Sequence, residues 1–204
     1  MASLQNTENR YGPIAVALHW IMALLLIVLV TLGVYMVRLP DVGFDTKKIT
    51  LILYHKQLGM LALTLAALRL AWRVTNALPR LVDSLPDWQK VIARLVHLTF
   101  YALMLALPIT GWLMSSADGF TVSFLGLFNL PDLVSHDENL FRVLAVLHKW
   151  LGYALIPLLA IHAGAALRHH FLFRDDTLRK MLPASSVSSY SHERTPPVAP
   201  KPSP

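Results

Sequence analysis

The sequence has no cysteine among its 204 residues. This absence excludes disulfides, iron–sulfur clusters and thiolate zinc sites, and it also excludes covalent attachment of a haem through a C-x-x-C-H motif. A cofactor embedded in this protein would therefore have to be held by histidine side chains and by shape.

Charged side chains are also scarce. Asp, Glu, Lys and Arg make up 15% of the chain, whereas hydrophobic residues make up 55% and the mean hydropathy is +0.51. A soluble domain of this size does not bury so much apolar surface, so the composition indicates a protein whose solvent is a lipid bilayer.

Four apolar stretches carry most of the hydrophobic residues, and they span residues 14–37, 49–72, 91–114 and 140–171. Each exceeds the roughly 20 residues that a helix needs to cross about 30 Å of hydrocarbon. Pro, Gly, Asp and Lys fill the segments between them, as is typical of loops. The sequence therefore predicts an all-α membrane protein, a four-transmembrane-helix up-down bundle over residues 13–182.

Two polar segments flank this bundle. Residues 1–12 lack the basic region of a signal peptide, so the first helix is expected to remain in the mature protein. Residues 183–204 are rich in Ser and Pro and have nothing to bury, which predicts a disordered tail.

The distribution of Lys and Arg predicts the orientation. Twelve of these 18 residues fall on the side that holds both termini and the loop between the second and third helices, and six fall on the other side. Because basic residues are enriched on the cytoplasmic side, both termini are expected in the cytoplasm of a multi-pass protein of a bacterial inner membrane. This bias accounts for most of the net charge of +6 without a nucleic-acid partner.

Four histidines fall at two predicted depths. His148 and His162 are 14 residues apart on the fourth stretch, which is about 21 Å along one face of a helix. The helix directions then place His55 opposite His148 towards the periplasm and His19 opposite His162 towards the cytoplasm. Two imidazoles opposed across a bundle can supply both axial ligands of a haem iron, so the pattern predicts two bis-histidine haem sites.

A short repeat supports this interpretation. The segments "HKQLG" and "HKWLG" begin at His55 and His148 and place Gly59 and Gly152 one turn beyond each histidine. A position without a side chain allows a flat macrocycle to lie close to the backbone. The alternative is that each histidine is an interhelical hydrogen-bonding group, which is common for a single histidine in a membrane helix.

Two other histidines have different expectations. His97 has no predicted partner at its depth, which favours a structural or propionate-contacting role over ligation. His136 falls in a polar outer loop and is expected to face solvent.

Several motifs together resemble the bacterial cytochrome b561 family in its dihaem, superoxide oxidase-like form. They are "ALHW", "YHKQLG", "LHKWLGY", "LAIHAGAALRHHF" and "FRDDTLRKMLP", and the resemblance covers about residues 11–183. It implies two b-type haems in four helices that pass electrons between the periplasmic face and the ubiquinone pool of the respiratory chain. It also implies that the haem ligands are His19, His55, His148 and His162.

His169 is the candidate for the quinone end. It lies seven residues beyond His162, on nearly the same face and nearer the cytoplasm. An imidazole there could hydrogen-bond a quinone carbonyl and exchange a proton, and the resemblance associates a histidine at this position with quinone. The alternative is an interfacial histidine that meets lipid headgroups. Arg168 and His170 are expected to be anchors at the membrane surface.

Lys56 and Lys149 each follow a histidine of the outer pair directly. We hypothesise that these ammonium groups, with Arg142 nearby, neutralise haem propionates and attract a small anion such as superoxide. The alternative is that they are ordinary interfacial lysines, because acidic residues in the outer loops offset their charge.

Three classes of function remain open from the sequence. The first is an oxidoreductase that links superoxide or another small periplasmic donor to ubiquinone. The second is a haem-b anchor subunit that exchanges electrons with a periplasmic redox protein or dehydrogenase, although the short outer loops show no evident apolar docking patch. The third is a haem-free proton or metal transporter, which the lack of acidic residues inside the four helices disfavours.

Overall fold

The computed structural model describes residues 4–40, 45–79 and 86–183. These residues form four long helices, α1 (Pro13–Arg38), α2 (Thr46–Thr75), α3 (Asp87–Ala117) and α4 (Glu138–Arg168). All four are long and apolar enough to cross a membrane, so the predicted four-helix membrane bundle is confirmed. The predicted disordered tail lies outside the described residues from position 184 onward.

α2 and α4 begin a few residues before their apolar stretches because an aspartate side chain caps the start of each helix. Pro13 opens α1, where its fixed φ suits the first helical turn. The Asp45 side chain accepts hydrogen bonds from the backbone N–H groups of Lys47 and Lys48, and Asp137 caps α4 in the same way. Hydrophobicity alone therefore places the helix starts a few residues too late.

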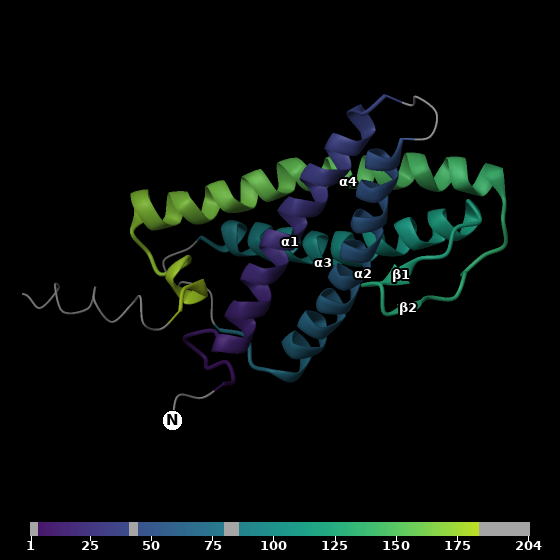
Figure 1. Ribbon diagram of the computed structural model, residues 1–204. Coiled ribbons are helices and arrows are strands. Elements are labelled where there is room, and N and C mark those ends of the chain that lie inside the picture. The colour runs from purple at the N-terminus through teal and green to yellow at the C-terminus, as the bar shows by residue number, and fades with distance from the viewer. Residues whose placement is uncertain (1–3, 41–44, 80–85, 184–204) are drawn as a thin grey trace, which may run out of the picture.

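The helices pack as two pairs that face each other. α1 packs on α2 and α3 packs on α4, while α2 contacts α3 and α1 has little contact with α4 (Figure 1). The core lies where the two pairs meet, roughly midway along each helix. It is formed by Met22, Leu25, Leu26, Ala62, Ala66, Phe100, Leu103, Met104 and Leu155. On every helix the core residues lie between a segment at one end of the bundle and a segment at the other end.

The connection between α3 and α4 forms a small hairpin at one end of the bundle. Strand β1 (Ser123–Phe124) pairs antiparallel with β2 (Phe128–Asn129). The turn needs positive φ at Leu125 and at Gly126, of 51° and 74°. The hairpin contacts the first part of α2. We call this end of the bundle the hairpin end.

The hairpin end carries exposed apolar side chains. Phe120, Leu127 and Phe128 are 60%, 75% and 56% exposed. The expectation that the outer loops lack an apolar patch is therefore wrong. The reason is that a two-residue-strand hairpin is too small to bury both of its faces.

The first and last described segments of the chain meet at the opposite end, which we call the terminal end. The side chain of Arg10 donates a hydrogen bond to the carbonyl of Leu182 at 3.1 Å, and the Trp20 indole donates to that of Met181 at 2.7 Å. Asn6 likewise donates to the carbonyl of Ala77 after α2. Residues 6–10, the part of the chain just after α2 and the C-terminal turn thus lie together, as the grouping of basic residues assumed.

Candidate functional site

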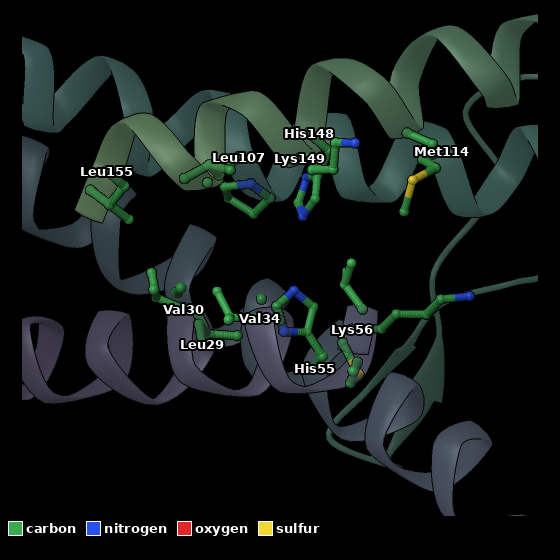
Figure 2. Close-up of a pocket in the computed structure, with 18 of the residues that line it drawn as sticks. Leu29, Val30, Val34, His55, Lys56, Leu107, Met114, His148, Lys149 and Leu155 are labelled. Carbon is green, nitrogen blue, oxygen red and sulfur yellow. The ribbon is translucent and has the colours of Figure 1, made fainter. Parts of the chain in front are cut away.

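A histidine pair faces a large cavity at the hairpin end. His55 from α2 and His148 from α4 lie on opposite sides of this space (Figure 2), with ring centroids 6.1 Å apart and planes at 82°. The cavity has a volume of about 550 Å³ and is lined mainly by apolar side chains from all four helices. The lining includes Leu29, Val30, Val34, Leu107, Met114 and Leu155.

The surroundings of His148 select its tautomer. The Thr110 hydroxyl donates its single proton to the carbonyl of Leu107 at 2.9 Å. The same oxygen lies 3.1 Å from Nδ1 of His148, so it accepts a hydrogen bond from an N–H at that atom. The lone pair of His148 is then on Nε2, as a metal-ligating imidazole requires. Across the cavity, Nδ1 of His55 is buried and has no partner among the described residues.

Two glycines of neighbouring helices fix the position of these rings. A Cβ added at Gly111 would lie 3.2 Å from Cε1 of His148, and one at Gly33 would lie 3.4 Å from Cε1 of His55. A side chain at Gly111 would press on the imidazole of His148, whereas one at Gly33 would be in van der Waals contact with that of His55. No sequence motif signalled this role, because the glycines lie on different helices from the histidines they contact.

Gly59 and Gly152 differ from Gly33 and Gly111, because they do not contact an imidazole. Both line the cavity, and an added Cβ would meet nothing within 4 Å at either position. The open space is compatible with the predicted close approach of a flat group. Their role in binding one stays a prediction.

A second histidine pair lies at the terminal end. His19 from α1 and His162 from α4 have ring centroids 6.2 Å apart and planes at 56°. His97 from α3 also lies at this level, with its ring 5.5 Å from that of His162. The expectation that His97 has no partner at its depth is therefore wrong, because the packing of α3 on α4 brings the two residues together.

Arg69 is hydrogen-bonded to a histidine of this second pair. Its Nη2 lies 2.9 Å from Nδ1 of His19, and a guanidinium can only donate, so Nδ1 is the acceptor. The guanidiniums of Arg69 and Arg73 both lie over the Tyr101 ring, at 5.8 and 5.4 Å from its centroid. The sequence pattern marked these arginines only as basic residues near the membrane surface.

His169 is paired with a carboxylate that no motif signalled. α4 continues as a π-helix, η1 (His169–Phe173), and Arg174 then adopts a left-handed conformation with φ 53°. This reversal brings Oδ2 of Asp175 to 2.6 Å from Nδ1 of His169. The two side chains are only 12% and 15% exposed, respectively. His169 is therefore held by the protein at its Nδ1 atom.

The environment of Asp175 keeps its carboxylate charged. Burial raises the pKa of this group, but hydrogen bonds from Thr177 and His169 outweigh burial and lower the pKa overall. The backbone N–H of Thr177 donates to Oδ1 at 2.9 Å. An ionised Asp175 therefore accepts the Nδ1–H of His169 near neutral pH.

Arg168 and His170, the two residues next to His169, differ in their exposure. Arg168 is exposed, with its guanidinium 4.7 Å from the Phe173 ring centroid, as expected of an anchor. Nδ1 of His170 is buried without a partner in the described part of the chain. His170 as a whole is only partly exposed, and its role as an anchor stays a prediction. His136 is exposed, as predicted.

The candidate cations of the hairpin end also differ from one another. Lys56 is partly buried, and its Nζ donates to the buried Ser115 hydroxyl at 2.8 Å. Lys149 is exposed at the edge of the cavity. Arg142 forms an exposed ion pair with Glu138 at 2.8 Å and is not among the residues that line the cavity. Lys149 is thus the cation that remains accessible beside the histidines.

Both histidine pairs fit the axial ligation of one iron. Two imidazole nitrogens bonded to one metal at about 2.0 Å place the ring centroids about 6 Å apart. The observed separations are 6.1 and 6.2 Å. The hairpin-end cavity supplies apolar space beside its pair, and the preset tautomer of His148 directs a lone pair towards it.

Comparison with known proteins identifies the family. The sequence profile described as prokaryotic cytochrome b561 matches residues 10–184. The chain belongs to this family. Membership implies b-type haem and a role in membrane electron transfer, so the haem-free transporter is excluded as an interpretation.

Named relatives share nearly the whole chain. Cytochrome b561 homolog 2 of Escherichia coli K12 is 36% identical over 90% of this chain and 97% of its own length. Cytochrome b561 homolog 1 of the same organism is 34% identical over 86% and 98%. A Yersinia pestis protein named "probable superoxide oxidase CybB" is more distant, at 25% identity over 86% and 97%.

The close contact at Gly111 generates a first prediction. Gly111→Ala should displace the imidazole of His148 and shift the low-spin ferric electron paramagnetic resonance signal of one haem, because that signal depends on the orientation of the axial rings. Gly164→Ala is the matched control, since a Cβ there meets nothing within 4 Å, and it should leave the spectrum unchanged. A spectrum of Gly111→Ala identical to the wild type would show that the contact does not fix the ring.

Proposed function

We propose that this cytochrome holds two haem b groups and carries electrons across the bacterial inner membrane from superoxide to ubiquinone. The observation that carries the proposal is the presence of two imidazole pairs, each spaced for one iron, at opposite ends of one bundle. On α4 the two levels are 14 residues apart, or about 21 Å. Such a separation suits transfer from one membrane face to the other.

The ligand assignment follows the two pairs. His55 and His148 hold the hairpin-end haem, and His19 and His162 hold the terminal-end haem. A haem between two imidazoles supplies one-electron redox chemistry and leaves no open coordination position, which disfavours oxygen activation at the iron. Gly59 and Gly152 leave room for the macrocycle at the hairpin end.

The hairpin end is assigned to the periplasm and the terminal end to the cytoplasm. The excess of Lys and Arg at the terminal end supports this orientation. Superoxide is an anion and crosses a bilayer poorly, so superoxide on the periplasmic side then meets the exposed ammonium group of Lys149. Lys56 donates a hydrogen bond to Ser115. In this proposal it positions groups at the same site and does not itself meet superoxide.

The electron balance determines what the terminal end must do. Each superoxide loses one electron and leaves as dioxygen, so two superoxide anions reduce one ubiquinone. The quinone also takes up two protons to become the quinol. A quinone site therefore needs a hydrogen-bonding group that can pass on a proton.

His169 meets that need at the terminal end. The hydrogen bond from Nδ1 to Asp175 fixes the ring and leaves Nε2 for a quinone carbonyl. When the imidazole is protonated, Nε2 donates to the carbonyl, and the adjacent carboxylate stabilises the charge. The pair argues against a histidine that reaches only for lipid headgroups, since the His169 side chain is only 15% exposed.

The relatives support the cytochrome part of this proposal more strongly than the choice of superoxide as the electron donor. The more similar proteins carry only the cytochrome name, whereas superoxide appears in the name of the 25% identical relative. The choice of superoxide therefore depends on the position of Lys149 more than on similarity.

A periplasmic redox protein is the second candidate donor. The exposed Phe120, Leu127 and Phe128 of the hairpin end favour it, because apolar side chains that extend from a membrane protein's loops can form the centre of a docking surface. In that case the protein is an anchor subunit, and the hairpin replaces Lys149 as the element that selects the donor.

The assignment of ligands predicts the behaviour of four single variants. His55→Ala and His148→Ala should each remove the hairpin-end haem, and His19→Ala and His162→Ala should each remove the other, because one imidazole holds the iron poorly. Pyridine haemochrome content and redox titration should show two matching pairs of variants, and the wild type should hold two haems per chain. Matching spectra for His19→Ala and His148→Ala would overturn the pairing.

Stopped-flow reduction by superoxide tests the donor. Lys149→Gln should slow haem reduction and weaken its dependence on ionic strength, because salt can only screen an attraction that exists. Arg142→Gln is the control, since Arg142 is paired with Glu138 away from the cavity, and it should behave as the wild type. If superoxide reduces neither haem of the wild type, the donor is not superoxide, and replacement of Leu127 and Phe128 by Ser then tests the protein donor.

The carboxylate beside His169 generates a prediction for the acceptor end. Asp175→Asn should slow electron exchange with a soluble ubiquinone analogue while both haems stay bound, because the amide does not stabilise a protonated imidazole. Asp176→Asn is a closely matched control, since Asp176 is 65% exposed and pairs with Arg179, and it should have little effect. Equal rates in the two variants would argue against a quinone site at His169.

A further inference from the structure

Two arginines at the terminal end have no carboxylate partner in the described structure. Arg69 and Arg73 are one turn apart on α2 and are only partly exposed. Beyond its first residue, each of the four helices lacks Asp and Glu altogether. Within residues 4–40, 45–79 and 86–183, the ion pairs involve other residues. Two cations this close together in a membrane-spanning helix are costly unless an anion lies between them.

The geometry of the two side chains points to a common target. Both guanidiniums lie over the ring of Tyr101, within 5.8 Å of its centroid. Contact with one aromatic ring holds two like charges near each other, and apart from the bond of Arg69 to His19 it leaves N–H groups that can donate to an anion. Planar guanidinium groups in this arrangement match the oxygen pairs of carboxylates.

Tyr11 adds a neutral donor to the same cluster. Burial raises the pKa of its phenol, although the nearby Arg73 acts in the opposite direction. The hydroxyl therefore keeps its proton and can donate. The cluster thus offers two cations and a phenol to an anion, and His97 is packed at the same level through His162.

The bond from Arg69 to His19 cannot coexist with ligation of a metal by His19. If Nε2 of His19 binds iron, the ring proton resides on Nδ1, which then donates and cannot accept from a guanidinium. Arg69 must consequently find another acceptor when His19 is a ligand. The acceptor has to lie within reach of the Arg69 side chain, and hence close to the haem macrocycle that surrounds the iron.

We propose that Arg69 and Arg73 form a carboxylate clamp for the propionates of the haem held by His19 and His162, and that Arg69 leaves His19 to engage them. Haem b carries two propionate carboxylates, and the cluster offers two guanidiniums. This inference depends on the proposed terminal-end haem. A lipid phosphate is also an anion that two arginines could bind, and the lipid composition of the nanodiscs distinguishes it from the haem propionates.

The test uses the haem-loaded protein in phosphatidylcholine nanodiscs. The variants are the double substitution Arg69→Gln with Arg73→Gln, the charge-conserving Arg69→Lys with Arg73→Lys, and Arg94→Gln as the control, because Arg94 is exposed on α3 near the same end. Spectroelectrochemical titration measures the midpoint potential of each haem. Transfer to an excess of apomyoglobin measures how fast each haem is lost.

The glutamine variant should lower the potential of the terminal-end haem, because the loss of two nearby cations stabilises the more positive ferric state. It should also release that haem faster, by about tenfold for each charge-assisted hydrogen bond lost. The lysine variant should preserve the potential but still release the haem faster, since an ammonium lacks the fork that matches a carboxylate. The hairpin-end haem and the Arg94→Gln protein should be unchanged.

Three results would overturn the clamp. One is a potential that does not change in the glutamine variant, and another is an equal change in both haems. The third is an effect that appears only when anionic phosphatidylglycerol is added, which would assign the arginines to lipid phosphate. A wild-type protein with one haem would instead contradict the proposed function, and the haem count is made before any variant is compared.

Discussion

Polar side chains at membrane depth must be satisfied inside this protein, because lipid offers them no hydrogen-bonding partner. This constraint explains most of the site. Thr110 accepts a hydrogen bond from His148, Arg69 donates one to His19, and Lys56 donates one to Ser115. His148 and His19 each have a hydrogen-bonded partner at Nδ1, whereas Nδ1 of His55 has none among the described residues.

The way the helices pair creates the space that the histidines share. α1 and α4 hardly touch, so the two helix pairs meet only through their central core and the α2–α3 contact. Apolar residues fill the middle, while the hairpin end opens into a cavity of about 550 Å³. Glycines at the edge of this space, rather than larger residues, let the imidazoles stand against the opposing helices.

The sequence predicts the parts that depend on one helix at a time. Hydrophobic length defines the four spans, and helical periodicity with alternating direction places His55 with His148 and His19 with His162. What the sequence does not predict depends on contacts between helices or on irregular backbone. His97 meets His162 only because of how α3 packs on α4.

Irregular backbone accounts for the largest omission at the site. The contact of Asp175 with His169 requires a π-helix followed by a left-handed Arg174, and no local pattern in "HHFLFRDD" specifies either. The hairpin shows the same limit, since its exposed aromatic residues follow from a turn of two-residue strands that composition does not reveal.

The two ends of the bundle differ in charge as well as in shape, and the difference bears on the direction of electron flow. Two guanidiniums lie at the level of His19 and His162, whereas the hairpin-end pair has one partly buried ammonium group and one exposed to water. Nearby cations favour the reduced form of a redox centre, and they act more strongly where water is excluded. If both proposed haems are present and their propionates leave part of this charge uncancelled, the terminal-end haem would be the better electron acceptor. The electrostatics of the bundle are therefore consistent with the proposed transfer from the hairpin end to the terminal end, where the His169–Asp175 pair is the proposed proton donor.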